Sequence, residues 1–479
     1  MLLRIAATNA FTCRPLSCGG LLLAPLLRVY RMQLWTALMA VLVVAGCSSN
    51  RNARIGASIQ QNLTAKPSTS AENVSTAVDR FYKARQYAPV WVPDGDLSKV
   101  ASALGVLRSA EAHGLVASDY GEEAIAGAIE DGDKSTERLA QLDIDVTTNL
   151  LALGHDVAMG RVNPREIDSH WKTQRTPPDF VALLAQAAAG DLNTWLPSVQ
   201  PKHPEYGALQ QELTAIRAQG ASLTDERSRL LALNLERWRW LPDDLGPRHI
   251  LVNVPSFHLV VRESGRTALD MKVVVGKVET TRRTPIFSSE MGTVVFSPYW
   301  NVPDSIVEGE TAPAVARDPS FLDRNNIEIL RRSQRGTELV EPASVDWDDA
   351  EELKQLLFRQ RPGPGNALGH VKFLFPNPFH VYLHDTPADA LFARSGRALS
   401  HGCVRLEQPE ALAQYLLRDS AEWNAERIHT AMYSGDETAV ALKEKIPVHI
   451  VYFTAWPRTG GGFETWPDVY GHDAKQRQN

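Results

Sequence analysis

The stretch HVYLHDTPADALFARSGRALSHGCVR, residues 380–405, combines the strand pattern that decides the fold with the reactive groups that indicate a function. Its first residues, 380–384, are rich in bulky side chains, which predicts a strand. Cys403 follows them. A free cysteine with a pKa of about 8.5 is mostly protonated at neutral pH, and a neighbouring imidazole is its usual activator. We therefore expect His384 to lie within hydrogen-bond range of the Cys403 sulfur and to keep it ionised and reachable.

The residues beside the thiol fit the same chemistry. Gly402 has no Cβ, so the backbone N–H groups of Gly402 and Cys403 are expected to form an oxyanion hole. The planar guanidinium of Arg405 suits a substrate carboxylate. Each residue also has a structural interpretation, because a lone cysteine is often a small buried apolar residue and a histidine beside a strand is often a hydrogen-bonded structural group.

A zinc site is the competing chemical interpretation, with four candidate ligands: His380, His384, His401 and Cys403. The chain has no Cys-x-x-Cys pair and no His-Glu-x-x-His helix, and a thiolate bound to zinc would lose its nucleophilic role. We therefore expect no metal and no cofactor.

The flanking segments predict a mostly β domain over residues 246–456. Runs rich in Val, Ile, Phe and Tyr and bounded by Pro, Gly or Asn are typical of strands. They occupy residues 249–254, 258–262, 271–275, 293–296, 371–375, 380–384 and 448–452. Residues 303–360 interrupt them with a charged, helix-forming insertion, which is either a lid over the site or a surface decoration.

The preceding residues have a helical pattern. Apolar residues recur at three- and four-residue spacing, which predicts a helical scaffold domain over residues 72–245. Trp238 and Trp240 near its end are expected to pack in a core or a domain interface rather than to contact a ligand. The predicted fold class is α+β: a helical N-terminal scaffold domain, then a mostly β catalytic domain with a helical capping insertion.

Residues 1–47 have the features of an export signal. The uncharged run LWTALMAVLVVAG, residues 34–46, would form about 20 Å of helix, too short for a bilayer core of roughly 30 Å. Basic residues precede it, as in a secretory signal. VAGC, residues 44–47, resembles the lipobox of bacterial lipoproteins, which implies cleavage before Cys47 and a lipid on its sulfur. An ordinary signal peptide or anchor with a chance cysteine is the alternative.

These features predict where the protein resides. Residues 48–71 contain no aromatic residue and few large apolar ones, which predicts a flexible tether, and the glycine run and polar end of residues 457–479 predict a loose C-terminal tail. We expect a lipid-anchored protein at the periplasmic face of the cell envelope. Ser48 after the lipobox favours the outer membrane. Translation could start at Met1 or Met32.

The composition excludes several classes of protein. Hydrophobic residues make up 44% of the chain and charged residues 22%, which is typical of soluble globular proteins and not of disordered, collagen-like or polytopic membrane proteins. The net charge is −6 and the basic residues form no long run, so no nucleic-acid partner is expected. Cleavage before Cys47 would leave Cys403 as the one free thiol. A free thiol in an oxidising compartment is prone to oxidation, so its retention indicates a function, and catalysis is the obvious candidate.

His384 followed by SHGC at residues 400–403 resembles the signature of bacterial L,D-transpeptidases, a histidine and then a Ser/Thr-His-Gly-Cys element. The agreement extends to NLERWRWLP (residues 234–242), SPYWNVP (297–303) and RPGPGNALGHVKFLF (361–375), and runs from about residue 72 to the C-terminus. The chain is similar to the large Gram-negative branch, which has a scaffold and a capping insertion.

The resemblance implies a ping-pong acyl transfer on tetrapeptide stems of peptidoglycan. Cys403 would attack a diaminopimelate carbonyl, expel D-Ala and form a thioester, while His384, held by the Asp385 main-chain carbonyl, would act as base and acid. The amine of a second diaminopimelate would then give a 3-3 crosslink. Carbapenem-type β-lactams are implied as covalent inhibitors. Substrate contact is implied for Tyr382, Arg405 and His401, and for His401 a structural role is equally compatible.

Several alternatives stay open. The acyl acceptor could be water, as in an L,D-carboxypeptidase, or a lysine of an envelope protein. A non-catalytic scaffold is less compatible because such relatives usually lose the cysteine or the histidine, and a papain-like protease has a different cysteine context. Larger members of the branch carry a peptidoglycan-binding module before the segment that begins at residue 234. We expect that module to be absent or vestigial here, so glycan targeting would come from the scaffold, the cap or the lipid tether.

Overall fold

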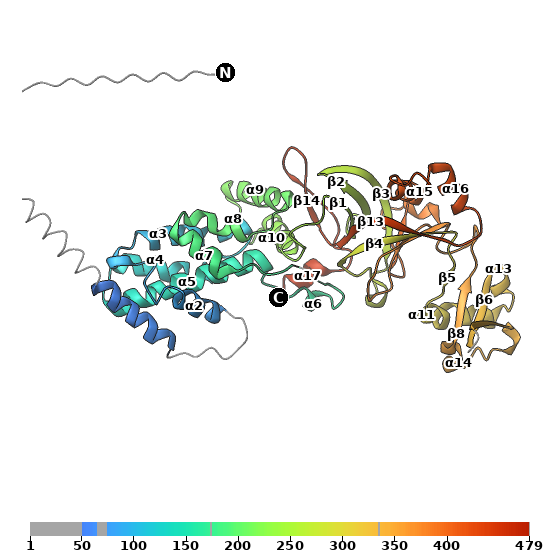
Figure 1. Cartoon of the computed structure of the whole chain (residues 1–479), viewed down its shortest axis with the longest axis horizontal. Helices are drawn as coiled ribbons and strands as arrows, with labels where there is room; N and C mark the ends of the chain where they lie inside the picture. Colours follow the sequence, from blue (N-terminus) through green and yellow to red (C-terminus); the bar gives the residue numbers. More distant parts are fainter. Residues whose placement is uncertain (1–49, 65–73, 173–174, 334–335, 479) are drawn as a thin grey trace, which may run out of the picture.

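The computed structural model describes residues 50–64, 74–172, 175–333 and 336–478, so the predicted signal segment and Cys47 lie outside the described residues. Figure 1 shows a helical N-terminal part, a strand-rich part beside it and a smaller sheet at the far end. This order confirms the predicted α+β architecture.

The helical part is built around α5 (Thr136–Met159), which is buried along most of its length. The carboxylate of Asp143 in this helix accepts hydrogen bonds from the backbone N–H groups of Val90, Trp91 and Val92, which fixes the loop after α2. The other helices are α2 (Val74–Lys83), α3 (Ser98–Arg108), α4 (Glu122–Asp131), α6 (Pro164–Ile167), α7 (Phe180–Ala189), α8 (Trp195–Val199), α9 (Pro204–Ala218) and α10 (Glu226–Trp238).

The prediction of a flexible tether over residues 48–71 is wrong for all of its described part, residues 50–64. Residues 50–64 form a helix, and Ile55 and Ile59 are fully buried in the core of the helical part. Arg51 adds two hydrogen bonds to main-chain carbonyls outside this helix. The segment lacks aromatic residues, but two isoleucines four positions apart lie on one helix face, and burying them offsets the cost of ordering the segment.

Eight strands of the second part pair in a closed ring. The order is β1-β2-β3-β12-β10-β9-β4-β13, and β13 pairs in turn with β1. Their bounds are β1 (Arg248–Asn253), β2 (His258–Glu263), β3 (Arg266–Gly276), β4 (Phe287–Phe296), β9 (Val371–Leu374), β10 (Leu383–His384), β12 (Val404–Leu406) and β13 (Thr438–Val451), with β11 (Ala398–Ser400) added at β3. All seven predicted strand runs fall on this sheet, although the run 380–384 is a strand only at its last two residues.

The insertion at residues 303–360 is not the helical unit that its composition predicted. It contains short helices, α11 (Asp304–Ile306), α12 (Ala312–Arg317), α13 (Phe321–Arg324) and α14 (Ala350–Gln355), but also a four-stranded sheet of order β5-β8-β6-β7. The strands of this sheet are β5 (Trp300–Asn301), β6 (Ile327–Ser333), β7 (Gly336–Val340) and β8 (Leu356–Gln360), so the insertion begins at β5, three residues before the predicted boundary. In β8 alternate side chains are buried, as in a strand. This short period-two pattern was not recognised in the sequence because the residues before it are charged and helix-forming. The insertion has its own apolar core and is the smaller sheet of Figure 1.

The prediction of a loose C-terminal tail is also wrong. Residues 457–479 include β15 (Phe463–Thr465), which pairs with β14 (Ala455–Pro457), and α17 (His472–Gln476). The buried Arg237 guanidinium pairs with Asp473 at 2.6 Å and also hydrogen bonds to Gln476. These polar contacts are invisible to a composition argument, and they attach the chain end to α10.

The two tryptophans of the segment that links both parts are buried, as predicted. Trp238 stacks on Phe453 with ring centroids 4.4 Å apart, and Trp240 meets Trp171 edge to face at 5.1 Å. The Trp238–Phe453 pair joins the helical part to the strand-rich part, and Trp171 does so as well because its ring also lies 6.1 Å from that of Tyr452.

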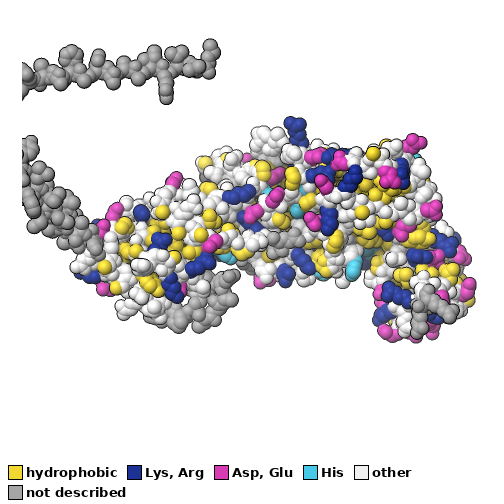
Figure 2. All heavy atoms as spheres, viewed as in Figure 1, with side chains coloured by type: hydrophobic (Ala, Val, Ile, Leu, Met, Phe, Trp, Pro, Cys, Tyr) yellow, Lys and Arg dark blue, Asp and Glu magenta, His cyan; other side chains and the backbone are white. Residues whose placement is uncertain are grey.

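The visible face of the molecule carries mixed charge. Figure 2 shows basic and acidic side chains interspersed over both parts, in line with 50 basic and 56 acidic residues in the chain. Within the described ranges, no helix is long and apolar enough to cross a membrane.

Candidate active site

The pairing of β10 with β12 brings the predicted reactive residues together. The strands are parallel, with Leu383 opposite Val404 and His384 opposite Arg405. Leu383 and Val404 are fully buried in the barrel core. Because successive side chains of a strand point to opposite faces, His384 and Arg405 lie on the other face. Tyr382 and Cys403 precede these strands by one residue each and are joined to the same group by the contacts described next.

His384 is held as a neutral base. Its Nδ1 lies 2.5 Å from the main-chain carbonyl oxygen of Asp385, the hydrogen bond expected from the sequence. A carbonyl oxygen only accepts, so Nδ1 carries the proton and Nε2 has a free lone pair. Burial lowers the pKa of His384 to about 3, and the nearby charge of Arg405 contributes to this. The imidazole is therefore uncharged at neutral pH and able to take a proton.

Cys403 is a protonated thiol in this conformation. Its side chain is half-buried, and desolvation raises its pKa to about 11. Hydrogen bonds from the Tyr382 backbone N–H and hydroxyl and the charge of Arg405 oppose that shift without cancelling it. In this conformation burial of the thiol outweighs the groups that favour its anion, so the expectation of a resting ionised sulfur is not supported.

Tyr382 connects the thiol to the imidazole and to the insertion. Its side chain hydrogen bonds to Cys403, and its ring centroid is 5.7 Å from that of His384. Burial, the first cause, and the neighbouring Cys403 raise the pKa of Tyr382, while a hydrogen bond with Trp300 of β5 lowers it. The phenol thus positions the sulfur, a contact that the sequence did not predict.

The turn that carries Cys403 is fixed by hydroxyl groups. The Ser400 hydroxyl donates to the Cys403 carbonyl oxygen at 2.6 Å and accepts from the Gly402 N–H at 3.1 Å. Gly402 has a φ of +118°, a conformation that favours glycine. Because its N–H already has Ser400 as partner, the expectation that Gly402 donates to an oxyanion is not met in this conformation. The Cys403 N–H is the remaining predicted donor.

Thr284 and Tyr470, for which the sequence predicted no role, hold this turn in place through hydrogen bonds. The Thr284 hydroxyl donates to the Gly402 carbonyl oxygen and accepts from the Gly276 N–H, both at 2.8 Å. The Tyr470 hydroxyl accepts from the Thr284 N–H and donates to the Gly276 carbonyl oxygen. A Cβ at Gly276 would lie 2.1 Å from the Arg282 carbonyl oxygen, so only glycine fits there. Tyr470 belongs to the segment predicted to be a loose tail, and no sequence signal marked it.

His401 faces the insertion. Its Nε2 lies 2.8 Å from a carboxylate oxygen of Glu310, and the same oxygen is 3.4 Å from Arg282. Although partial burial raises the pKa of Glu310, the hydrogen bond from His401 and the nearby positive charges lower it overall. The structure therefore joins His401 to the insertion, and its predicted contact with substrate is unsupported in this state.

Arg405 has spare binding capacity. Its side chain is half-buried, and its Nε is buried without a hydrogen-bond partner among the described residues. Burial lowers the pKa of Arg405, and Cys403 opposes that shift when its thiol is ionised. A guanidinium with unused donors beside the thiol is suited to a planar carboxylate.

The candidate zinc ligands do not form a metal site. His380 is exposed and has a φ of +56°, outside the range of a strand. Across the part of the chain that the structure describes, no group of three or more His, Cys, Asp or Glu side chains is placed to hold a metal ion.

Comparison with known proteins gives two matching families and one similar sequence. Residues 76–213 match the Scaffold domain, and residues 247–450 match the L,D-transpeptidase catalytic domain. A Haemophilus influenzae protein named "putative L,D-transpeptidase" is 31% identical over 410 residues, which is 82% of this chain and 77% of that protein.

Two solved structures also match part of this chain. An LD transpeptidase in complex with imipenem matches 43% of this chain and 59% of its own, with 16% identity and a TM-score of 0.20. The carbamoyl enzyme of Ldtfm with avibactam matches 43% and 49%, with 13% identity and a TM-score of 0.18. This chain therefore spans less than two thirds of either solved chain.

Proposed function

This chain belongs to the L,D-transpeptidase family, and we propose that it forms 3-3 crosslinks in peptidoglycan through a thioester on Cys403. The observation that supports this proposal most is the β10–β12 register, which places a neutral imidazole with a free Nε2 on the strand next to the one that Cys403 precedes.

In the proposed acylation, the thiol and the base react together. His384 Nε2 takes the thiol proton while the sulfur attacks the diaminopimelate carbonyl carbon of a tetrapeptide stem. The C–N bond to D-Ala then breaks, and the imidazolium returns the proton to the departing amine. A thioester and free D-Ala result. Proton transfer during attack is needed because the resting thiol, with a pKa of about 11, is hardly ionised at neutral pH.

The second half-reaction is proposed to use the same groups. His384 takes a proton from the side-chain amine of an acceptor diaminopimelate, the amine attacks the thioester carbonyl, and the proton is returned to the departing sulfur. The Cys403 N–H stabilises the oxyanion in both halves. The unused Nε of Arg405 binds a carboxylate of the stem.

We further propose that the insertion protects the thioester from water. It reaches the site twice, through Trp300 against Tyr382 and through Glu310 against His401. A thioester reacts with water as well as with amines, so a cover that excludes bulk water favours crosslinking over hydrolysis.

The proposed reaction is tested with purified disaccharide tetrapeptide as sole substrate. We expect mass spectrometry to show dimers linked between two diaminopimelates, together with one released D-Ala per dimer. Accumulation of disaccharide tripeptide with no dimer would mean acyl transfer to water, and absence of any product would favour a non-catalytic scaffold. Either result contradicts the crosslinking proposal.

The cover is tested by Glu310→Gln. We expect this change to weaken the contact with His401 and to raise the ratio of tripeptide to dimer several-fold. Glu310 is 46% exposed in its side chain, and exposed ion pairs contribute about 1 kcal/mol or less, so the free energy of unfolding should hardly change. Glu308→Gln, an exposed neighbour without a hydrogen-bond partner among the described residues, is the matched control. An equal product ratio in both variants would refute the cover.

We also propose that the lipobox at residues 44–47 is used, so that Cys47 carries a lipid and the protein is held at the periplasmic face of the outer membrane. Fractionation of cells that produce Cys47→Ser tests this: the variant should leave the membrane fraction, and retention there would contradict it.

A further inference from the structure

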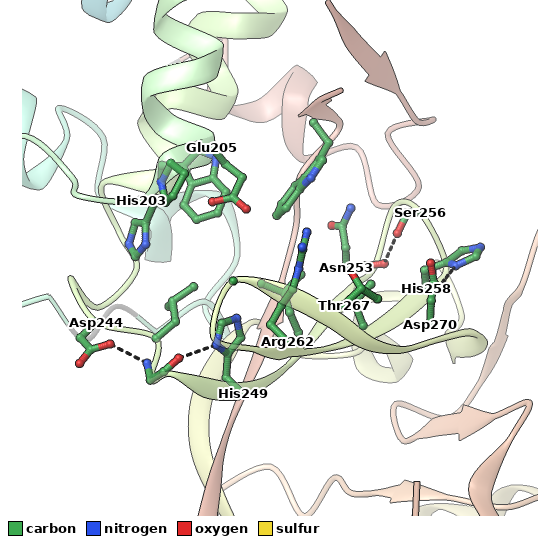
Figure 3. A pocket seen from close by; sticks show the side chains of 18 of the residues that line it. His203, Glu205, Asp244, His249, Asn253, Ser256, His258, Arg262, Thr267 and Asp270 are labelled. Atoms are coloured by element: carbon green, nitrogen blue, oxygen red, sulfur yellow. Dashed lines mark hydrogen bonds and ion pairs between the residues drawn. The ribbon is translucent and has the colours of Figure 1, made fainter. Parts of the chain in front are cut away.

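A cavity lies away from the thiol, where the helical part meets the strand-rich part. It measures about 670 Å³ and lies within the range of roughly 300–1,000 Å³ typical of ligand pockets. None of the residues that line it belongs to the Cys403 site. Figure 3 shows His203 and Glu205 on one side and His249 and Arg262 on the other.

The outer face of the β1–β2 hairpin forms one wall. Three cross-strand pairs line the cavity: His249 with Arg262, Leu251 with Val260, and Asn253 with His258. Both edges of β1 and of β2 are already paired, so this wall offers side chains and no free strand edge. A ligand held here is therefore recognised by side-chain groups.

Several charged groups of the cavity have no partner. The carboxylates of Glu205 and Glu464 and the guanidinium of Arg262 make no hydrogen bond or ion pair within the described residues. By contrast, His249 and His258 are bonded, to the Gly246 carbonyl oxygen and to Asp270. The unpaired groups come from α9, β15 and β2, three elements that surround one space.

A buried donor from α10, on another side of the cavity, also lacks a hydrogen-bond partner among the described residues. Trp238 is 1% exposed and lines the cavity, and its Nε1 has no hydrogen-bond partner among the described residues. A buried N–H without an acceptor costs about 1–3 kcal/mol, so native proteins rarely leave one without a reason. Phe453 stacks on the Trp238 ring and the His203 imidazole lies 4.9 Å away between ring centroids, while Leu245 and Leu251 add apolar groups to the cavity lining.

Two further tryptophans present indole surface. Trp456 and Trp466 line the cavity and are half-buried, and the Trp466 ring has no ring partner within the described residues. The face of an indole carries negative charge and attracts weakly positive C–H groups, which line the flat face of a sugar ring.

We infer that this cavity binds an oligosaccharide of N-acetylated amino sugars. The indole faces of Trp456 and Trp466 receive sugar rings, and Glu205, Glu464 and Arg262 bond to hydroxyl groups. The acetamido group accounts for the remaining feature: a small shift of the Trp238 ring uncovers Nε1, which is closed to solvent here, so that the acetamido carbonyl accepts from it while the methyl packs on Leu245 and Leu251. This inference goes beyond the proposed acyl transfer and does not depend on it.

The test uses the detergent-solubilised full chain and the tetramer of β-1,4-linked N-acetylglucosamine as probe, with binding measured by calorimetry. We expect Trp466→Ala and Glu205→Gln each to weaken binding at least about tenfold, a loss of about 1.4 kcal/mol. Two matched controls lie outside the cavity, the exposed aromatic Tyr433→Ala and the exposed acid Glu123→Gln, and both should bind as the wild type does.

The acetamido contact has its own readout. The glucose tetramer, which lacks the acetamido groups, should bind at least about tenfold more weakly, and Trp238→Phe, which keeps an aromatic ring and removes the N–H, should abolish that preference. Equal affinity for both tetramers, or a preference that survives Trp238→Phe, would overturn this assignment.

Other results would overturn the cavity as a saccharide site. These are no binding of the amino-sugar tetramer, equal binding in the cavity and control variants, or binding of a free tetrapeptide stem in its place. Failure of the acyl transfer proposal would be seen separately, since Cys403→Ser should bind the tetramer normally and Trp466→Ala should still be acylated by a carbapenem at the wild-type rate.

Discussion

Cys403→Ser should eliminate covalent labelling by a carbapenem and all product from tetrapeptide stems. In the wild type the sulfur opens the β-lactam ring, forming an S–C bond as the lactam C–N bond breaks, and the protein gains the full mass of the drug. A serine hydroxyl is far less acidic than a thiol, and His384, with its pKa lowered to about 3 by burial, is too weak a base to activate it. The rate should fall by at least about 10⁴-fold.

Intact-protein mass spectrometry after incubation with the drug checks this prediction. The substitution changes one atom at a half-buried position and keeps the bonds of the neighbouring Ser400 and Thr284, so the melting curve should match that of the wild type. A folded variant that still gains the drug mass would remove Cys403 from its assigned role and, with it, the proposed mechanism.

The features that could be predicted from the sequence are those that leave a local pattern in it. The alternation of apolar residues placed the strands of the barrel, and the spacing of His384 and Cys403 with a recognisable motif between them placed the site on adjacent strands. The hydrogen bond from His384 to the Asp385 carbonyl was implied by the family resemblance, and the structure contains it.

What could not be predicted depends on contacts between distant segments. Thr284 reaches Gly402 across 118 positions, and Tyr470 reaches Gly276 across 194. Such hydrogen bonds leave no period in the sequence. The same holds for the helix at residues 50–64, whose stability comes from burial against the remainder of the helical part. The charge state of Cys403 belongs to this class as well, because its pKa is set by burial and not by the residue beside it.

The protonated resting state of Cys403 predicts the second large effect. It concerns how the rate constant of acylation by a carbapenem depends on pH. With pKa values of about 3 for His384 and about 11 for Cys403, the reactive pair is neutral imidazole and thiol throughout the range between them. Below that range the base becomes protonated, and above it the thiol is already ionised. The second-order rate constant of the wild type should therefore be nearly flat from pH 5 to about pH 9.

His384→Asn should change this profile as well as the rate. An asparagine amide can still donate to the Asp385 carbonyl, so the loop is kept while the base is lost. Without a base, only the small thiolate fraction reacts, and this fraction rises tenfold per pH unit toward the thiol pKa. We expect a loss of about 10²–10⁴-fold at pH 7 that shrinks steadily as the pH rises.

Stopped-flow measurement of acylation between pH 5 and 10 tests whether His384 acts as the base on a protonated thiol. His380→Asn, at an exposed histidine of the same segment, is the control and should keep both the rate and the flat profile. If the wild type instead showed a bell-shaped profile near neutrality, the resting state would be a thiolate and imidazolium pair. If His384→Asn lost the same factor at every pH, the histidine would act by positioning groups and not as the base.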